Sequence, residues 1–230
     1  MKYKAVVFDL DDTLFDREGA QIRVVKLIVQ RLPQIFQTHK IERVIEAFIE
    51  SDRLSIVEFE SGAPTDGLRD KRARTFLQLL GINDAYADAI NEMYIKDYPS
   101  MNMPVAGAVP LVKRISTSVP VAVVSNGLPD VQYKKIETIG LADVFSCIIL
   151  SEEIGIRKPD HRIFHHAAKL LKVQPSDCLY VGDSYSTDII GAKTAGMQTC
   201  WLNRKSTKPD NPNTQADFVI TDLVELNAIL

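Results

Sequence analysis

The sequence Ala5-Val6-Val7-Phe8-Asp9-Leu10-Asp11-Asp12-Thr13-Leu14-Phe15-Asp16 sets four aspartates directly behind a run of four apolar residues. The apolar run predicts a short buried strand over Lys4–Leu10. Carboxylates crowded at the end of a buried strand repel one another and lose hydration, which costs free energy. A bound divalent cation would offset this cost, and covalent chemistry by one carboxylate would explain why acids are needed here.

Further strand-like segments along the chain indicate an α/β fold. They alternate with helical patterns over Pro129–Ile139, His161–Leu171 and Thr187–Ala195. This alternation predicts a Rossmann-like parallel sheet with helices on both faces, whose ligands bind at the carboxyl ends of the strands. The remaining expected strands are Val119–Ser125, Phe145–Leu150, Cys178–Gly182, Thr199–Leu202 and Asp217–Thr221.

About a hundred residues separate the first two expected strands, which is too many for one crossover helix. We therefore expect a catalytic core of residues 1–16 and 101–230, and an inserted all-helical cap domain of residues 17–100. The stretch 61–66 indicates a break between cap helices, and 205–215 indicates a surface loop. The expected cap helices cover Ile22–Arg31, Ile41–Ser51, Leu68–Leu80 and Ala85–Tyr98.

The composition is that of an ordinary globular protein, with 46% hydrophobic and 25% charged residues. A net charge of −3 gives no field that would attract a nucleic acid polymer or an anionic membrane, and no apolar run reaches the length of a membrane span. The amino terminus lacks the apolar stretch of a signal peptide. Cys147, Cys178 and Cys200 lie in separate apolar segments, which favours reduced core cysteines and a cytoplasmic location. Monomer and homodimer both remain open.

Polar residues at four predicted strand ends define a candidate site. The carboxyl ends of parallel strands share one rim of the sheet, so residues far apart in the chain can converge there. Each motif alone has an ordinary explanation, since an aspartate after a strand is usually a turn or helix cap. In this order, on successive strand ends, they favour a single site. The motifs are Asp9-x-Asp11-x-Thr13, Ser125-Asn126-Gly127, Lys158, and Gly182-Asp183-Ser184 with Asp188.

Asp9 and Asp11 have the spacing of a nucleophile and an acid/base. Residues two apart in an extended segment point the same way, so both can face one substrate. One carboxylate can attack phosphorus to give an aspartyl-phosphate, while the other protonates the leaving oxygen and later deprotonates water. Attack on an anionic phosphoryl group needs charge neutralisation. A Mg²⁺ held by Asp9, Asp183 and one backbone carbonyl would supply it together with Lys158.

Together these motifs resemble those of the haloacid dehalogenase-like hydrolase superfamily, and the resemblance covers the whole chain. The helical insertion after the first motif resembles the branch with a C1-type α-helical cap. Ser151-Glu152-Glu153-x-Gly155-x-Arg157-Lys158-Pro159 and Gly196-Met197-x-Thr199-Cys200-Trp201-x-Asn203 are similar to bacterial house-cleaning nucleoside 5′-monophosphatases. The resemblance implies a Mg²⁺-dependent phosphatase acting on a small phosphorylated metabolite, first a nucleoside 5′-monophosphate and second a sugar phosphate.

The same resemblance implies a role for each motif residue. Asp9 is the nucleophile, and Asp11 is the acid/base, which also gives its backbone carbonyl to Mg²⁺. Asp183 is a metal ligand, and Asp188 is either a ligand or a partner of the ligands. The residues implied to bind and neutralise the phosphoryl group are Thr13, Ser125, Asn126 and Lys158.

Asp11 separates this chain from two branches of the superfamily. Haloacid dehalogenases proper lack the second aspartate, and phosphonate hydrolases carry a small residue at that position. A phosphomutase shares every core motif and stays open. A non-catalytic sensor of a phosphorylated ligand also stays open, although a sensor has no need of the pair Asp9 and Asp11.

Three other features receive ordinary explanations. His161 and His165 have the spacing of a metal pair on a helix but no third ligand nearby, so they are expected on the surface. The mixed run Arg69–Arg74 predicts a solvated helix face with i, i+4 pairs to acids. Trp201 is expected in the core.

Overall fold

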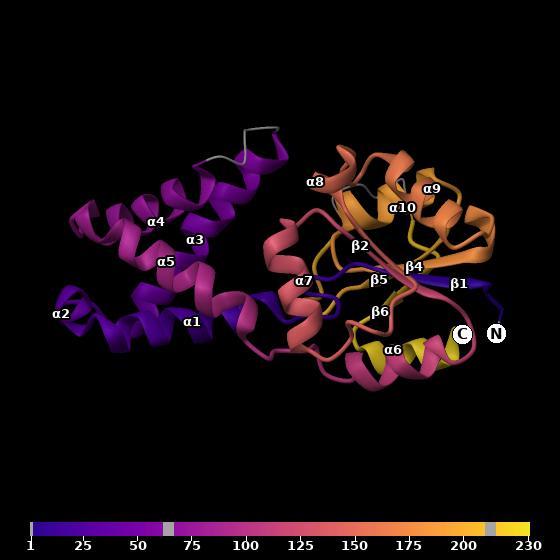
Figure 1. Ribbon diagram of the computed structural model, residues 1–230, viewed down its shortest axis with the longest axis horizontal. Coiled ribbons are helices and arrows are strands. Elements are labelled where there is room, and N and C mark those ends of the chain that lie inside the picture. Colours follow the sequence, from indigo (N-terminus) through magenta and orange to yellow (C-terminus); the bar gives the residue numbers. More distant parts are fainter. Residues whose placement is uncertain (1, 62–66, 210–214) are drawn as a thin grey trace. The chain divides into compact units, whose positions relative to one another are not determined.

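The computed structural model describes residues 2–61, 67–209 and 215–230 (Figure 1). The expected break at 61–66 lies outside these ranges except for its first residue. Part of the expected loop at 205–215 also lies outside them. The part of that loop that is described, residues 205–209 and residue 215, has no helix or strand.

The chain forms two compact units, which we call the core and the helical unit. The core consists of Met1–Asp16 and Asn102–Leu230, and the helical unit consists of Arg17–Met101. The chain leaves the core after its first strand and returns to it before the second. The sheet is therefore assembled from segments on both sides of a long insertion.

The core is built on a six-stranded parallel sheet with the order β3-β2-β1-β4-β5-β6, which confirms the predicted α/β class. The chain builds outward from β1 on one side and then from β4 on the other, so the topological switch point lies between these two strands. Open α/β sheets bind ligands at the carboxyl ends of the strands next to such a point. The strands are β1 (Ala5–Phe8), β2 (Val121–Ser125), β3 (Cys147–Leu150), β4 (Cys178–Gly182), β5 (Gln198–Leu202) and β6 (Phe218–Ile220).

Strands β1, β2 and β4 are buried along their whole length because helices cover both faces of the sheet. One face packs against α9 (His161–Leu170) and α10 (Ile190–Thr194), and the other packs against α6 (Ala108–Ser116) (Figure 1). The 3₁₀ segment Leu223–Ala228 packs beside α6. The other helical segments of the core are α7 (Pro129–Thr138), α8 (Ser151–Ile154), the 3₁₀ turn Pro175–Asp177 and the π-helical turn Tyr185–Ile189.

Several core elements begin at a different residue from the one the sequence indicated, among them β2 and the helix that leads into α10. β2 begins at Val121 instead of Val119, because Pro120 has no N–H to donate to the sheet. The helix expected over Thr187–Ala195 begins as a wider π-helical turn at Tyr185 and becomes α10 only at Ile190. Such single π-turns are frequent at functional sites.

The helical unit packs around a cluster of aromatic rings. Phe48 lies edge-on to Phe76, with 5.4 Å between ring centroids, and its ring is 5.1 Å from that of Tyr94. Helix α3 runs past its expected end at Ser51 and continues to Glu60. The helices of this unit are α1 (Arg17–Arg31), α2 (Pro33–Phe36), α3 (Ile41–Glu60), α4 (Leu68–Leu79) and α5 (Ala87–Asp97), with 3₁₀ turns at Asp84–Tyr86 and Tyr98–Ser100.

Arg72 corrects the expectation that Arg69–Arg74 is a solvated face. Its guanidinium pairs with the buried Asp52 at 3.2 Å and lies 3.9 Å from the centroid of the Tyr94 ring. Burial by itself would raise the pKa of Asp52, but Arg17 and Arg72 hold that pKa below its ordinary value. The sequence did not reveal this pairing because the carboxylate comes from another helix.

The cysteines and histidines lie where the sequence placed them. All three cysteines are free thiols, with Cys178 and Cys200 buried and Cys147 partly buried. His161 and His165 are exposed on α9, with their rings edge to face. Within residues 2–61, 67–209 and 215–230, no helix combines the length and apolar composition that crossing a membrane requires.

Candidate active site

The loop after β1 presents Asp9 and Asp11 at the rim of the sheet. Asp9 remains tied to the sheet because its N–H donates to the carbonyl of Val181 at 2.9 Å. Asp12 has a φ of 57°, a left-handed conformation that aspartate adopts more readily than most residues. Its N–H donates to the carbonyl of Phe15 at 2.7 Å and closes a tight turn. Asp9 is buried as a result, and Asp11 is half-buried.

Lys158 is the cation at the centre of the site. Its Nζ donates to Oδ1 of Asp9 at 2.5 Å, to Oδ1 of Asp188 at 2.6 Å and to the hydroxyl of Tyr180 at 3.2 Å. The Tyr180 hydroxyl in turn donates to Oδ1 of Asp188 at 2.9 Å. The ammonium group is buried and all three of its N–H bonds are directed, so its charge compensates two carboxylates.

Asn126 fixes the segment that carries this lysine. Its side-chain nitrogen donates to the carbonyl of Lys158 at 3.0 Å, and its side-chain oxygen accepts from the Lys158 N–H at 2.9 Å. The sequence assigned Asn126 to the phosphoryl group. In the structure its amide joins the end of β2 to the Lys158 segment and so fixes the position of Lys158.

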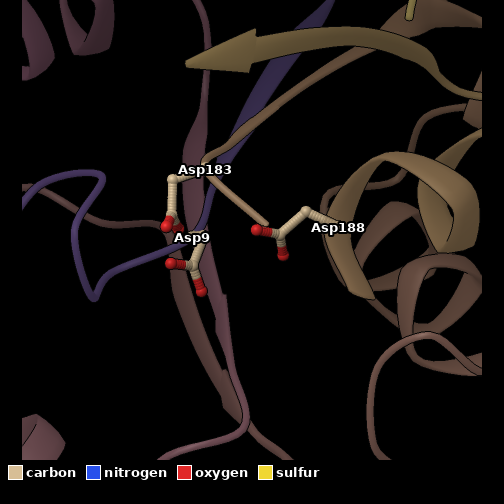
Figure 2. Close-up of side chains that lie close together, drawn as sticks. All are labelled: Asp9, Asp183 and Asp188. Atoms are coloured by element: carbon tan, nitrogen blue, oxygen red, sulfur yellow. The ribbon is translucent and has the colours of Figure 1, made fainter. Parts of the chain in front are cut away.

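Three aspartates converge beside Lys158. Asp9, Asp183 and Asp188 each offer an oxygen, and these oxygens lie within 4.8 Å of one another. Figure 2 shows the three side chains turned toward one another, Asp9 from directly after β1, Asp183 from directly after β4 and Asp188 from the π-helical turn. Carboxylate oxygens are the ligands that Mg²⁺ and other hard cations prefer. The described part of the chain therefore contains a donor set that fits a divalent cation.

The crowding of these acids shows in their pKa values. Burial, with the charges of Asp188 and Asp11, raises the pKa of Asp9 to about 7, although Lys158 opposes the rise. Burial and the charges of Asp9 and Asp188 raise the pKa of Asp183 well above its ordinary value. Protein side chains thus leave negative charge at this rim only partly compensated, as expected where a cation binds.

The turn after β4 holds the fourth motif in place. A Cβ on Gly182 would lie 2.4 Å from Oδ2 of Asp188, so the close approach of this carboxylate requires glycine. The Ser184 N–H donates to the same oxygen at 3.0 Å. Trp201, buried as expected, donates its Nε1–H to the carbonyl of Asp183 at 2.8 Å and so fixes the backbone of that residue.

The two expected phosphate-binding hydroxyls also reach the rim. Thr13 is buried, and its Oγ1 donates to Oδ1 of Asp183 at 3.4 Å. Ser125 ends β2, and its Oγ accepts the Gly127 N–H at 3.1 Å. Every residue that the sequence assigned to the site therefore lies at the carboxyl end of the sheet or in contact with a residue that does.

The comparison with protein families shows which family the chain belongs to. A family model described as haloacid dehalogenase-like hydrolase matches residues 3–196. The chain belongs to this family. It is thus an enzyme, and its relatives include phosphatases.

This hydrolase is similar to two curated relatives and to one solved structure. Pyrimidine 5′-nucleotidase YjjG of Escherichia coli is 29% identical over 208 residues, 88% of this chain and 87% of the relative. Mouse N-acylneuraminate-9-phosphatase is also 29% identical, over 100% of this chain and 94% of its own. The magnesium-bound putative HAD-hydrolase YfnB of Bacillus subtilis superposes with a TM-score of 0.85 at 25% identity, covering 100% of this chain and 99% of its own.

Sequence reasoning missed three residues of the hydrolase that touch the site. Tyr180 lies within β4 and bonds Lys158 and Asp188. Gln132 and Lys135 of α7 both reach Asp11. The available signal was their spacing, because two polar residues three apart share one face of a helix. Nothing in the sequence indicated that this face is buried.

We expect Lys158→Met to destabilise the metal-free hydrolase by about 3–5 kcal/mol, because Asp9 and Asp188 would then be buried without their cation. Urea unfolding in EDTA measures the change. Lys4→Met is the control, since the exposed Lys4 pairs with Asp177 at the surface and its loss should cost less than about 1 kcal/mol. Equal losses in the two variants would mean that Lys158 does not compensate the buried carboxylates.

Proposed function

We propose that this hydrolase is a Mg²⁺-dependent phosphomonoesterase that acts through an aspartyl-phosphate on Asp9. The observation that carries the proposal is the position of Lys158, whose Nζ lies 2.5 Å from the Asp9 carboxylate inside a cluster of acids. A buried ammonium group at this point neutralises charge on a phosphoryl group that approaches Asp9. A site that only stabilised the fold would have no need of more carboxylates than its one lysine can neutralise.

The reaction has two steps with matched proton transfers. An oxygen of Asp9 bonds to phosphorus while the phosphorus–oxygen ester bond breaks, and Asp11 gives its proton to the leaving oxygen. Water then attacks phosphorus, Asp11 takes the proton of that water, and the bond to Asp9 breaks. The products are an alcohol and inorganic phosphate, and both aspartates return to their initial state.

The acids fit Mg²⁺, and the magnesium bound to the Bacillus relative supports this assignment. Asp9, Asp183 and the Asp11 carbonyl would hold the ion, with Asp188 as a further ligand or as a partner of Lys158. When bound, Mg²⁺ supplies charge neutralisation for the phosphoryl group and for the carboxylates around it. Ser125, Thr13 and Lys158 would bind the phosphoryl oxygens.

The substrate we propose is a small phosphorylated metabolite in the cytoplasm. A nucleoside 5′-monophosphate is the first candidate, supported by the name of the Escherichia coli relative, pyrimidine 5′-nucleotidase. A sugar phosphate is the second, supported by the N-acylneuraminate-9-phosphatase of mouse. Three unpaired cysteines suit a reducing compartment. We further propose that residues 17–100, which form nearly all of the helical unit, are the cap domain of the enzyme.

Phosphate release from a substrate panel with Mg²⁺ tests the proposal. The panel pairs nucleoside 5′-monophosphates with their 3′ isomers and adds N-acylneuraminate 9-phosphate and hexose phosphates. A nucleotidase should show a higher kcat/KM for the 5′ isomers than for the 3′ isomers and the sugar phosphates. Release of no phosphate from any member would contradict the proposal. Conversion of one hexose phosphate into another without free phosphate would identify a phosphomutase instead.

A further inference from the structure

We infer that Gln132 and Lys135 of α7 are positioning residues that hold the acid/base Asp11, and that Gln132 also orients Ser125. The inference deepens the proposed function and rests on it, because it assigns the residues through which Asp11 and Ser125 act. Neither residue belongs to the motifs that the sequence singled out. Both are buried, although glutamine and lysine are among the residues least often found inside proteins.

The Asp11 carboxylate receives a hydrogen bond from α7 on each of its oxygens. Lys135 Nζ donates to Oδ1 at 2.5 Å, and Gln132 Nε2 donates to Oδ2 at 2.7 Å. The Lys135 ammonium group also lies 4.9 Å from the centroid of the Phe15 ring, which limits its position. Two donors on two oxygens fix both the place of the carboxylate and the rotation of its plane. Asp11 itself is on a loop, so this orientation comes from the helix.

Gln132 joins two parts of the site through one NH₂ group. Its Nε2 donates to Ser125 Oγ at 2.7 Å as well as to Asp11. The NH₂ group must face Asp11 while Asp11 is ionised, as it is when it takes the proton of water, because an ionised carboxylate can only accept. Ser125 Oγ then accepts from two N–H groups, those of Gln132 and Gly127. A hydroxyl oxygen has two lone pairs, so the remaining capacity of Ser125 is its O–H, which is available to donate to a phosphoryl oxygen.

Two further observations concern the space that the Gln132 amide occupies and the hydrogen bond that its oxygen lacks. A Cβ on Gly127 would lie 2.0 Å from Gln132 Nε2, so the amide occupies the space that any other residue at 127 would fill. The Oε1 of Gln132 is buried and finds no hydrogen-bond partner among the described residues. Buried polar atoms are nearly always paired. The exception here follows from directing the NH₂ group at Asp11 and Ser125.

Leaving-group dependence tests the inference. Lys135→Met should lower kcat/KM for phenyl phosphate by about 30–100-fold, because a misplaced acid no longer protonates a poor leaving group. For 4-nitrophenyl phosphate, which departs with little protonation, the loss should be under about fivefold. Gln132→Met should show the same pattern. Lys134→Met is the matched control, since this exposed lysine pairs with Glu137 on the same helix, and both esters should be hydrolysed at the parent rate.

Inhibition by inorganic phosphate separates the two positioning residues. Gln132→Met should raise the inhibition constant of phosphate by about tenfold, because Ser125 loses one of its orienting donors. Lys135→Met should leave this constant unchanged. If the inhibition constant rose in both variants, or in neither, the conclusion that Gln132 orients Ser125 would be overturned.

A double-mutant cycle with Asp11→Asn shows whether Lys135 acts through Asp11. If it does, Asp11→Asn with Lys135→Met should lose no more phenyl phosphate activity than Asp11→Asn alone. If Lys135→Met does not fold, Lys135→Gln takes its place in the same cycle. The inference would be overturned if the losses of the two single variants added in the double variant, or if each variant lost equal activity on the two esters. The proposed function would still stand in that case, provided that the parent protein hydrolyses the esters. A parent protein without activity on either ester would overturn both.

Discussion

An Asp9→Asn enzyme should release phosphate at least about 10³-fold more slowly than the parent, because the amide cannot attack phosphorus. It should nevertheless fold like the parent protein. Asparagine keeps the shape of the side chain, and the bond from the residue 9 N–H to the carbonyl of Val181 does not involve the side chain. The substitution also removes one negative charge from a crowded cluster. Steady-state phosphate release and thermal unfolding measure the two expectations.

Asp12→Asn is the matched control for this experiment. It makes the same chemical change three residues further on, and asparagine accepts the positive φ of residue 12 as readily as aspartate does. We expect this variant to keep most of the parent activity. Turnover by Asp9→Asn at a rate near that of the parent would rule out the covalent step on Asp9. Equal loss in both variants would show that the loop, and not its nucleophile, had been damaged.

Withdrawal of the metal should stop the reaction, and added Mg²⁺ should restore it. The same ion should raise stability, by about 2.7 kcal/mol at a hundredfold excess over its Kd, since it binds the folded site. Activity and urea unfolding, each in EDTA and with Mg²⁺, measure these effects. Asp183→Asn is the control, because loss of one ligand should remove most of the added stability.

The stability of the metal-free enzyme should fall as pH rises from about 4 to about 7. The pKa of Asp9 is near 3.8 in the unfolded chain and about 7 in the folded one. Between these values the folded state binds more protons than the unfolded state, so stability decreases with pH. Asp183, whose pKa is also raised, acts in the same direction. Carboxyls with a lowered pKa, such as Asp52, change the stability only at lower pH, so they do not oppose this trend.

Mg²⁺ should therefore stabilise the enzyme more at pH 7.5 than at pH 5.5, because the ion replaces protons that the carboxylates have lost. Melting temperatures at the two values, with and without the ion, give the comparison. A metal-free melting temperature that does not change over this range would mean that the acids at the rim are compensated without a cation. Equal stabilisation by Mg²⁺ at both pH values would mean that the ion binds outside the aspartate cluster.

The sequence predicted the sheet because each buried strand is a local apolar run. Strand β4 begins and ends at the residues expected, Cys178 and Gly182, since the run is bounded by polar residues and a turn. The predicted ends of helices and strands were less accurate where packing against another element sets the end. Helix α3 continues to Glu60 because it packs along α4, a contact between segments that no local pattern reveals.

The sequence by itself determined which residues meet at the candidate site, because the ends of parallel strands meet at one rim and the motif residues stand at those ends. Only the tertiary structure decided how these residues are held. Asn126 binds the backbone of Lys158, and Gln132 and Lys135 bind Asp11, from positions that are 32, 121 and 124 residues away. A buried polar side chain takes the partner that the fold brings to it, and spacing along the chain does not specify that partner.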